Sequence, residues 1–184
     1  MLYANVLTGK WDCHIPVGGG PYLQRQAERL HDLAHTCGEI SYAIESIACL
    51  ADALAVKAEL GHRIYAAYHA ENRDQIRQIA TQDIPLAIEK IQVFKTALRK
   101  QWMKENKPFG FDVISMRIGG LISQLQDASD TLLAWESCEL ASIDELEQPR
   151  LPYRPIPENG DCLLNLNRWL RIAGQNIANM FGYK

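Results

Sequence analysis

A regular apolar repeat runs between residues 111 and 136. Its apolar positions recur at alternating intervals of four and three residues: Ile114, Ile118, Leu121, Leu125, Ala128, Leu132 and Trp135. This spacing places them on one face of an α-helix. A seven-residue repeat also favours packing against neighbouring helices with nearly parallel or antiparallel axes. The repeat therefore predicts a long helix whose buried face lies against other helices of a bundle.

Three segments upstream also have helical patterns. Residues 39–59 carry an apolar stripe with the same spacing: Ile40, Ile44, Ile47, Ala51, Leu54 and Ala58. A helix over 21–36 is expected after the glycines at 18–20, because Pro21 suits a first helical position. A third helix is expected over 73–105, with Asn72 as a cap. Pro85 lies inside it and predicts a kink or a fresh start at Asp83.

These segments predict an all-α fold, an antiparallel bundle of four to five main helices. Residues 1–20 are expected to form an irregular entry segment, and residues 21–148 the bundle, including a short helix near 143–147. Residues 149–184 begin with four prolines that favour extended backbone. A short amphipathic C-terminal helix around Trp169, Ile172 and Ile177 is expected to follow and to pack on the bundle.

The composition excludes several classes of protein. A chain of 184 residues suits one domain with a real core. Its net charge of −3 does not suit a nucleic-acid-binding surface, and no apolar run approaches the roughly 20 residues of a membrane span. Five cysteines without a CxxC motif argue against a disulfide framework or zinc ribbon. With no signal peptide evident at residues 1–5, we expect a cytoplasmic protein without a cofactor.

Residues 105–121 suggest a tight corner between the last two long helices. Pro108 ends the first helix, and Gly110 allows a backbone angle that other residues disfavour. Phe109 and Phe111 are expected to plug the gap between the helices. Asp112 is expected to cap the second helix, and Arg117 to pair with Asp112 or Glu105. Each glycine of Gly119-Gly120 costs a helix about 1 kcal/mol against alanine, which suggests that another helix or a partner approaches closely there.

The same corner resembles the C-terminal helical region of bacterial β-N-acetylhexosaminidases of glycoside hydrolase family 20. The resemblance rests on Glu-Asn-Lys-Pro-Phe-Gly-Phe-Asp-Val at 105–113, with Trp102 before it and Arg-Ile-Gly-Gly-Leu at 117–121. Further matching stretches occur in order at 7–12, 54–61, 66–68 and 143–147, and more loosely at 167–169. Together they cover most of residues 5–150.

The resemblance implies a non-catalytic accessory domain. Family members carry catalysis on a (β/α)₈ barrel that precedes this region, where an Asp-Glu pair assists the substrate's own N-acetyl group. Asp144-Glu145 lacks that barrel context, so these roles are not assigned to it. The expected partners are the barrel of the same parent chain and a possible homodimer; an N-acetylated amino sugar would be bound only by the parent enzyme. The residues expected at an interface or at the rim of the sugar pocket are Trp11, Asn106, Lys107, Phe109, Phe111, Arg117, Gly119 and Gly120.

The sequence leaves two alternatives open. The chain could be a stand-alone helical dimerisation module, or a metal-dependent hydrolase that uses His31 and His35. These histidines are four residues apart on one helix face, as in zinc sites, and Glu39 is the only local third ligand. Tyr65, Tyr68, His62 and His69 form a further cluster, suited either to stacking on a sugar or to a half-buried seam with polar tips in water.

Overall fold

The structure is a computed structural model that describes residues 1–9, 12, 15, 16 and 18–150. Within these residues it is helical and contains no strand, so the predicted all-α fold is confirmed. The elements are α1 (Gly19–Thr36), η2 (Gly38–Ile40), α2 (Ser41–Lys57), α3 (Leu60–His69), α4 (Arg73–Gln78), η3 (Ile79–Asp83), α5 (Ile84–Glu105), α6 (Phe111–Glu136) and α7 (Asp144–Glu147).

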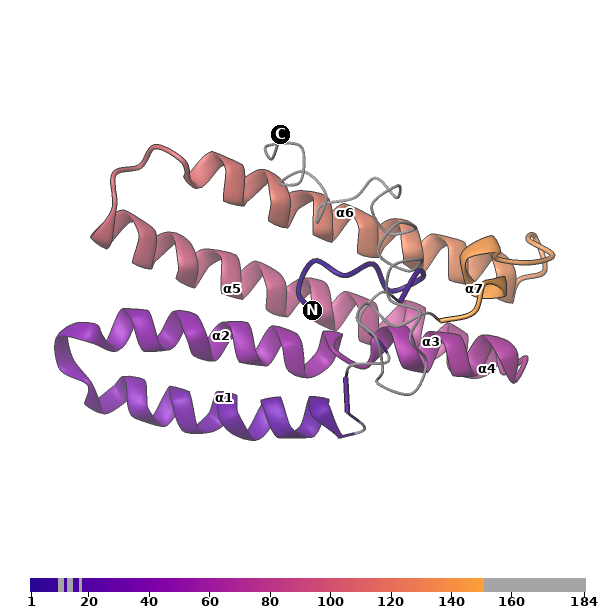
Figure 1. Cartoon of the computed structure of the whole chain (residues 1–184), viewed down its shortest axis with the longest axis horizontal. Coiled ribbons are helices and arrows are strands. Elements are labelled where there is room, and N and C mark those ends of the chain that lie inside the picture. The colour runs from indigo at the N-terminus through magenta and orange to yellow at the C-terminus, as the bar shows by residue number, and fades with distance from the viewer. Residues whose placement is uncertain (10–11, 13–14, 17, 151–184) are drawn as a thin grey trace, which may run out of the picture.

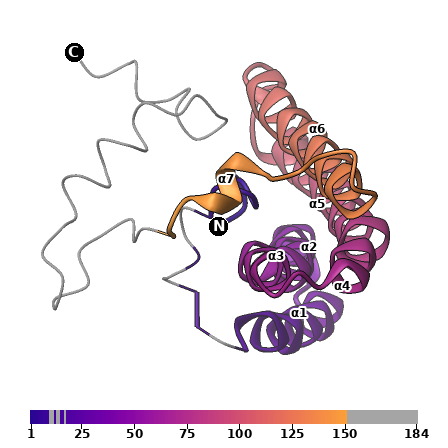
Figure 2. The ribbon, with the colours of Figure 1, turned by 90° about the vertical axis from the view of Figure 1, so that its right-hand side faces the viewer.

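The long helices lie side by side in a row (Figure 1), and the end-on view shows that the row is curved (Figure 2). α1 packs on α2, α2 on α5, and α5 on α6. The N-terminal segment and α7 both lie on one side of this row, next to α2, α3 and α6 (Figure 2). The two sides of the row therefore differ: the N-terminal segment covers part of one side only.

The core confirms one predicted stripe and corrects another. On α6, Ile118, Leu121, Leu125 and Leu132 are buried, as the repeat predicts. The predicted stripe of 39–59 is only partly buried: Ala51 and Ala58 are 8% and 6% exposed, but Ile47 of α2 and Ile40 just before it are 55% and 56% exposed. The core side of α2 is instead formed by small residues such as Cys49 and Ala53. α2 lies between two neighbours, so short side chains allow both to approach closely.

The helix break expected near Pro85 takes the form of a π-helix. The turn Ile79–Asp83 has π geometry, and α5 starts directly after it with Pro85 in its first turn. Proline has no N–H to donate and crowds the preceding turn, and a widened turn relieves that conflict. Ser129 of α6 donates a 2.9 Å hydrogen bond to the carbonyl oxygen of Ala80, so α6 supplies a donor to this segment.

Candidate functional site: the helical corner and the anchored entry segment

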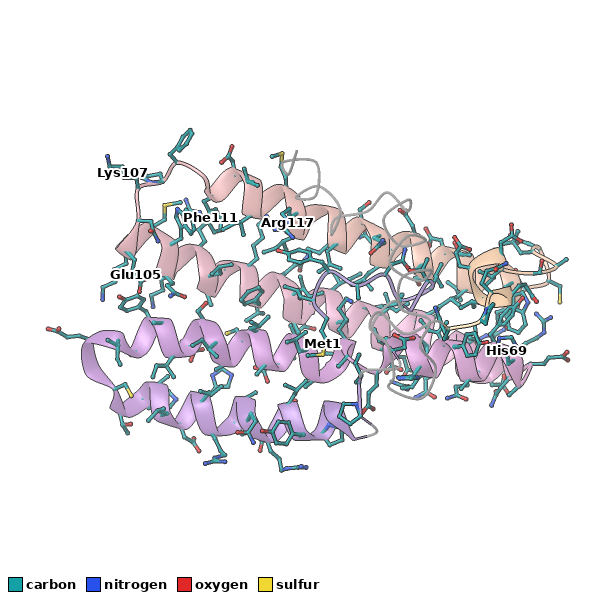
Figure 3. The ribbon with its side chains drawn as sticks, viewed as in Figure 1. Met1, His69, Glu105, Lys107, Phe111 and Arg117 are labelled. Carbon is teal, nitrogen blue, oxygen red and sulfur yellow. The ribbon has the colours of Figure 1, made fainter. Side chains whose placement is uncertain are left out.

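The corner between α5 and α6 is closed by Trp102. Its indole Nε1 donates a 2.9 Å hydrogen bond to the carbonyl oxygen of Lys107. The Trp102 ring also packs against Phe111, with ring centroids 6.0 Å apart. Gly110 has φ +97°, the left-handed conformation expected at this glycine. Phe111 lies between the two helices at this end of the row (Figure 3).

The two phenylalanines of the corner have different roles. Phe111 is buried, as expected, but Phe109 does not plug the gap: it is 93% exposed. Val113 and Met116, three residues apart on α6, are 50% and 67% exposed. Phe109, Val113 and Met116 thus form an exposed apolar strip, which we call the corner strip. Asn106 and Lys107 beside it are exposed as well.

Asp112 and Arg117 do not make the expected contacts. Gly110 occupies the cap position of α6, and no side chain caps that helix end. The Arg117 guanidinium lies over the ring of Tyr3, 4.4 Å from its centroid, rather than pairing with Asp112 or Glu105. Glu105 instead accepts a 3.3 Å hydrogen bond from the side-chain amide of Gln101. Burial raises the pKa of the Tyr3 hydroxyl, and the nearby Arg117 charge opposes that rise. Arg117 therefore connects α6 to the start of the chain.

Gly119, the first glycine of the Gly119-Gly120 pair in α6, has no close neighbour. A Cβ added at Gly119 would meet no atom within 4 Å, so no other part of the described chain approaches there. Gly119 is exposed and Gly120 is half-buried. The sequence suggests that another helix or a partner approaches the glycine pair, but no described part of this chain does so at Gly119.

The N-terminal segment, residues 1–9, is anchored in the body of the domain. Val6 and Leu7 are buried and belong to the main hydrophobic core. The Lys57 ammonium donates hydrogen bonds to the carbonyl oxygens of Met1 and Ala4, at 3.3 and 2.7 Å. Burial of Lys57 lowers its pKa to about 8. We call residues 1–9 the entry segment. Nothing in the sequence marks Lys57, the last residue of α2, as the residue that anchors it.

A second set of contacts fixes the entry segment from the other end of the described chain. Arg150 donates hydrogen bonds to the carbonyl oxygens of Leu7 and Val6. Its Nε lies 3.7 Å from the buried carboxylate of Asp12. Burial raises the pKa of Asp12, and the Arg150 charge opposes the rise. Asp12 comes so close to Gly61 that a Cβ there would lie 2.5 Å from its Oδ2. Trp11, beside Asp12, lies outside the described residues, as does Trp169.

The aromatic and histidine cluster holds α7 against α3. The Tyr68 hydroxyl accepts a 3.1 Å hydrogen bond from the backbone N–H of Ile143 and donates one to Glu147. His69 Nε2 lies 3.0 Å from the carbonyl oxygen of Leu146. His62 Nε2 is hydrogen-bonded to the backbone carbonyl oxygen of Asp12. The expectation of polar tips in water is therefore wrong for Tyr68. A polar cavity of about 360 Å³ lies beside Tyr68, between α3, α4, α6 and α7.

His31 and His35 do not meet in a metal site. The His31 ring lies between Glu45 and Asp52 of α2, with Nδ1–Oε2 and Nε2–Oδ2 distances of 3.0 and 2.9 Å. Glu39, the expected third ligand, is not among these contacts, and His35 is exposed. Among the described residues no group of three metal-ligating side chains is arranged to hold an ion. The His31 cluster instead joins α1 to α2.

Most glycoside hydrolases place two carboxylates on either side of the scissile bond. Asp12 is the one buried carboxylate in the part of the chain that the structure describes, and it faces Arg150. Asp144 and Glu145 are exposed in the first turn of the short helix α7.

A family model of the Glycoside Hydrolase 20C C-terminal domain matches residues 1–163. The chain belongs to this family. The match confirms the resemblance found in the corner and the entry segment. The family is by description a C-terminal domain, so its parent chain is a glycoside hydrolase with a catalytic domain as the partner of this one. A comparison with curated proteins gives no match. None of the helices in the described ranges is both long and apolar enough to cross a membrane.

Proposed function

We propose that this chain is a non-catalytic accessory domain that braces the catalytic barrel of a β-N-acetylhexosaminidase. The observation that carries the proposal is the anchored entry segment. In a C-terminal domain the polypeptide from the catalytic domain arrives through the N-terminal residues. Here those residues are held by the buried side chains of Val6 and Leu7 and by Lys57. A flexible tether would have a polar, Gly- or Ser-rich sequence instead.

An anchored junction has a mechanical consequence. Interfaces between domains of one chain allow relative motion unless they are large and apolar. Fixing the entry segment at Met1, Ala4, Val6 and Leu7 limits rotation about the junction, because its carbonyl oxygens are bonded to two different parts of the domain. The domain would therefore hold a defined orientation against the barrel. In this proposal the N-acetylated amino sugar is bound and cleaved by the barrel alone.

The proposal is tested in the parent enzyme with Lys57→Met and Arg150→Met. We expect both to shorten the half-life of activity at elevated temperature, with the KM for an aryl N-acetylglucosaminide unchanged. An unaltered half-life in the double variant would count against bracing. In the isolated chain we expect no turnover of that substrate; turnover that disappears in Asp144→Asn or Glu145→Gln would contradict the non-catalytic assignment.

A second role, in a subunit interface, is favoured by the corner strip. Phe109, Val113 and Met116 expose large apolar side chains at the corner and in the first turns of α6, and such patches often mark protein contacts. Sedimentation of the parent enzyme tests this role: Phe109→Ser should convert a dimer to a monomer. If the Phe109→Ser variant has the same mass as the wild type, the corner strip is not part of the interface.

We also assign the protein to the cytoplasm. Cys37, Cys49 and Cys138 are free thiols in the structure, which suits a reducing compartment. Cell fractionation with an antibody to the parent enzyme checks this assignment.

A further inference from the structure

The α1–α2 hairpin has an apolar face that nothing in the described chain covers. Ile40, Ile47 and Leu54 are seven residues apart, so they lie in one line along α2 and the turn before it. Ile40 and Ile47 are more than half exposed and Leu54 is half-buried. On α1, Leu33 is 46% exposed. We call Leu33, Ile40, Ile47 and Leu54 the hairpin face.

These four residues lie on one side of the hairpin, opposite to the His31 cluster. Two residues along an α-helix correspond to a rotation of about 200°. Ile47 and Leu54 each come two residues after Glu45 and Asp52, the two carboxylates that bind His31. Leu33 comes two residues after His31 itself. Because the His31 cluster marks one side of the α1–α2 contact, the hairpin face occupies the other side.

The entry segment lies over one end of the same line. Ala58 follows Leu54 one helical turn later. Ala58 and Gly61 line a small cavity together with Met1 and Ala4 of the entry segment. Figure 2 shows the N-terminus on this flank of the helical row, beside α2 and α3. The covered end of the stripe, with Ala58 6% exposed, thus continues into the uncovered end at Ile47 and Ile40.

We infer that the hairpin face is the surface on which the catalytic domain of the parent enzyme docks. The inference rests on the proposed function and adds the location of the contact. The polypeptide that leads in from the catalytic domain arrives on this side, so that domain is the partner with the shortest path to the hairpin face. The occupant must be apolar, because a polar partner would leave these side chains in contact with unfavourable groups. The opposite side of the hairpin carries His31, Glu45 and Asp52, which satisfy one another.

The test compares three lysine substitutions in the parent enzyme: Ile47→Lys on the hairpin face, Phe109→Lys on the corner strip, and Val93→Lys as a matched control. Val93 is 48% exposed and comes two residues after the fully buried Ile91, so it points away from the core of α5. All three side chains are exposed, so each variant should fold; the circular dichroism of the isolated chain checks this. Calorimetry and hydrogen exchange of residues 33–54 provide the readouts.

We expect Ile47→Lys to split one unfolding transition of the parent enzyme into two, while Val93→Lys leaves a single transition. Residues 33–54 should also exchange more slowly in the parent enzyme than in the isolated chain, and Ile47→Lys should abolish the difference. If Phe109→Lys splits the transition and Ile47→Lys does not, the contact is at the corner: the inference falls and the proposed function stands. If no variant splits it and deletion of the whole domain leaves the stability of the barrel unchanged, the proposed function falls as well.

Experiments on the isolated chain test two other possible occupants of the hairpin face. A dimer that Ile47→Lys dissociates would make a second copy the occupant. Protection of residues 33–54 that disappears when residues 151–184 are removed would make the chain's own C-terminal segment the occupant. Either result overturns the inference. A monomer with rapid exchange in this segment, with or without residues 151–184, is the result that the inference requires.

Discussion

Lys57 donates a 2.7 Å hydrogen bond to the carbonyl oxygen of Ala4, across 53 positions of the sequence. The lysine is only 4% exposed, and its charge is balanced in part by Asp12. A buried ammonium is costly unless its hydrogen bonds are made. Two carbonyl oxygens of the entry segment serve this purpose, so the position of that segment and the ionisation of Lys57 depend on each other.

Lys57→Met should lower the free energy of unfolding of the isolated chain by about 1–3 kcal/mol at neutral pH. The reason is that the carbonyl oxygen of Ala4 loses a 2.7 Å hydrogen bond from Lys57, and that of Met1 loses a longer one of 3.3 Å. Urea denaturation followed by circular dichroism measures the change. Lys104→Met is the control, since Lys104 is an exposed lysine over the Tyr42 ring and should cost far less.

The difference between the wild type and Lys57→Met should widen as pH rises from about 8 to 10.5, the folded and ordinary pKa values of Lys57. Because folding lowers this pKa, the unfolded chain keeps the proton over a range in which the folded protein has released it. Raising the pH through that range therefore favours the folded wild type. Denaturation midpoints of both proteins at pH 7, 8.5 and 10 measure the effect. A gap that stays constant would contradict the lowered pKa.

His31 should give a pH dependence of the opposite sign. Its hydrogen bond to Asp52, together with Glu45, raises its pKa above 6.5. The stabilisation it provides is therefore fully present below 6.5 and is lost as pH rises through the folded pKa. Beyond Glu45 and Asp52, Cys49 is the titratable group near this cluster on α2, and burial raises its pKa to about 11, outside this range.

The measurement for His31 is the thermal midpoint of the wild type and His31→Gln at pH 5.5 and 8.5. The wild type should lose stability relative to the variant between these values. His35→Gln, four residues along on the same helix and exposed, should keep the wild-type dependence. An identical pH profile for wild type and His31→Gln would show that the cluster does not titrate in this range.

Apolar spacing predicted the helices well but did not identify what covers them. The stripes of α6 and α2 follow the same rule of four and three residues, yet Leu121 is fully buried and Ile47 is 55% exposed. Periodicity reports that a helix has an apolar face; whether that face meets this chain or another depends on packing between distant segments. The hairpin face is therefore visible only in the folded chain.

The candidate site was predictable where its contacts are local. Gly110, Trp102 and Phe111 are within ten positions of one another, and turn chemistry predicts their corner. Nearness in sequence suggests Asp112 or Glu105 as the partner of Arg117, but its guanidinium lies over the ring of Tyr3 in the entry segment. Lys57 and Arg150 bind backbone carbonyls, which every residue offers, so no residue type marks their partners in advance.

Gly110→Ala should destabilise the isolated chain by about 1–2 kcal/mol, the cost of a left-handed backbone angle for a residue with a Cβ. The added Cβ would lie 3.5 Å from the Trp102 ring, an ordinary contact, so the cost is that of the backbone. Gly110→Asn should recover part of the loss, because asparagine tolerates this conformation. Chemical denaturation of the three proteins provides the comparison, and equal stability of all three would exclude strain at the corner.

Gly119→Ala should have the opposite effect in the isolated chain. The position is helical and exposed, and a Cβ there meets no atom within 4 Å, so alanine should stabilise α6 by up to about 1 kcal/mol. In the parent enzyme the outcome depends on the partner. If another domain or subunit packs on the backbone at Gly119, the methyl group will occupy the contact and the gain will be lost or reversed. Denaturation of the variant as isolated chain and as parent enzyme therefore measures whether this glycine serves a contact: equal gains in both would mean that nothing packs on Gly119.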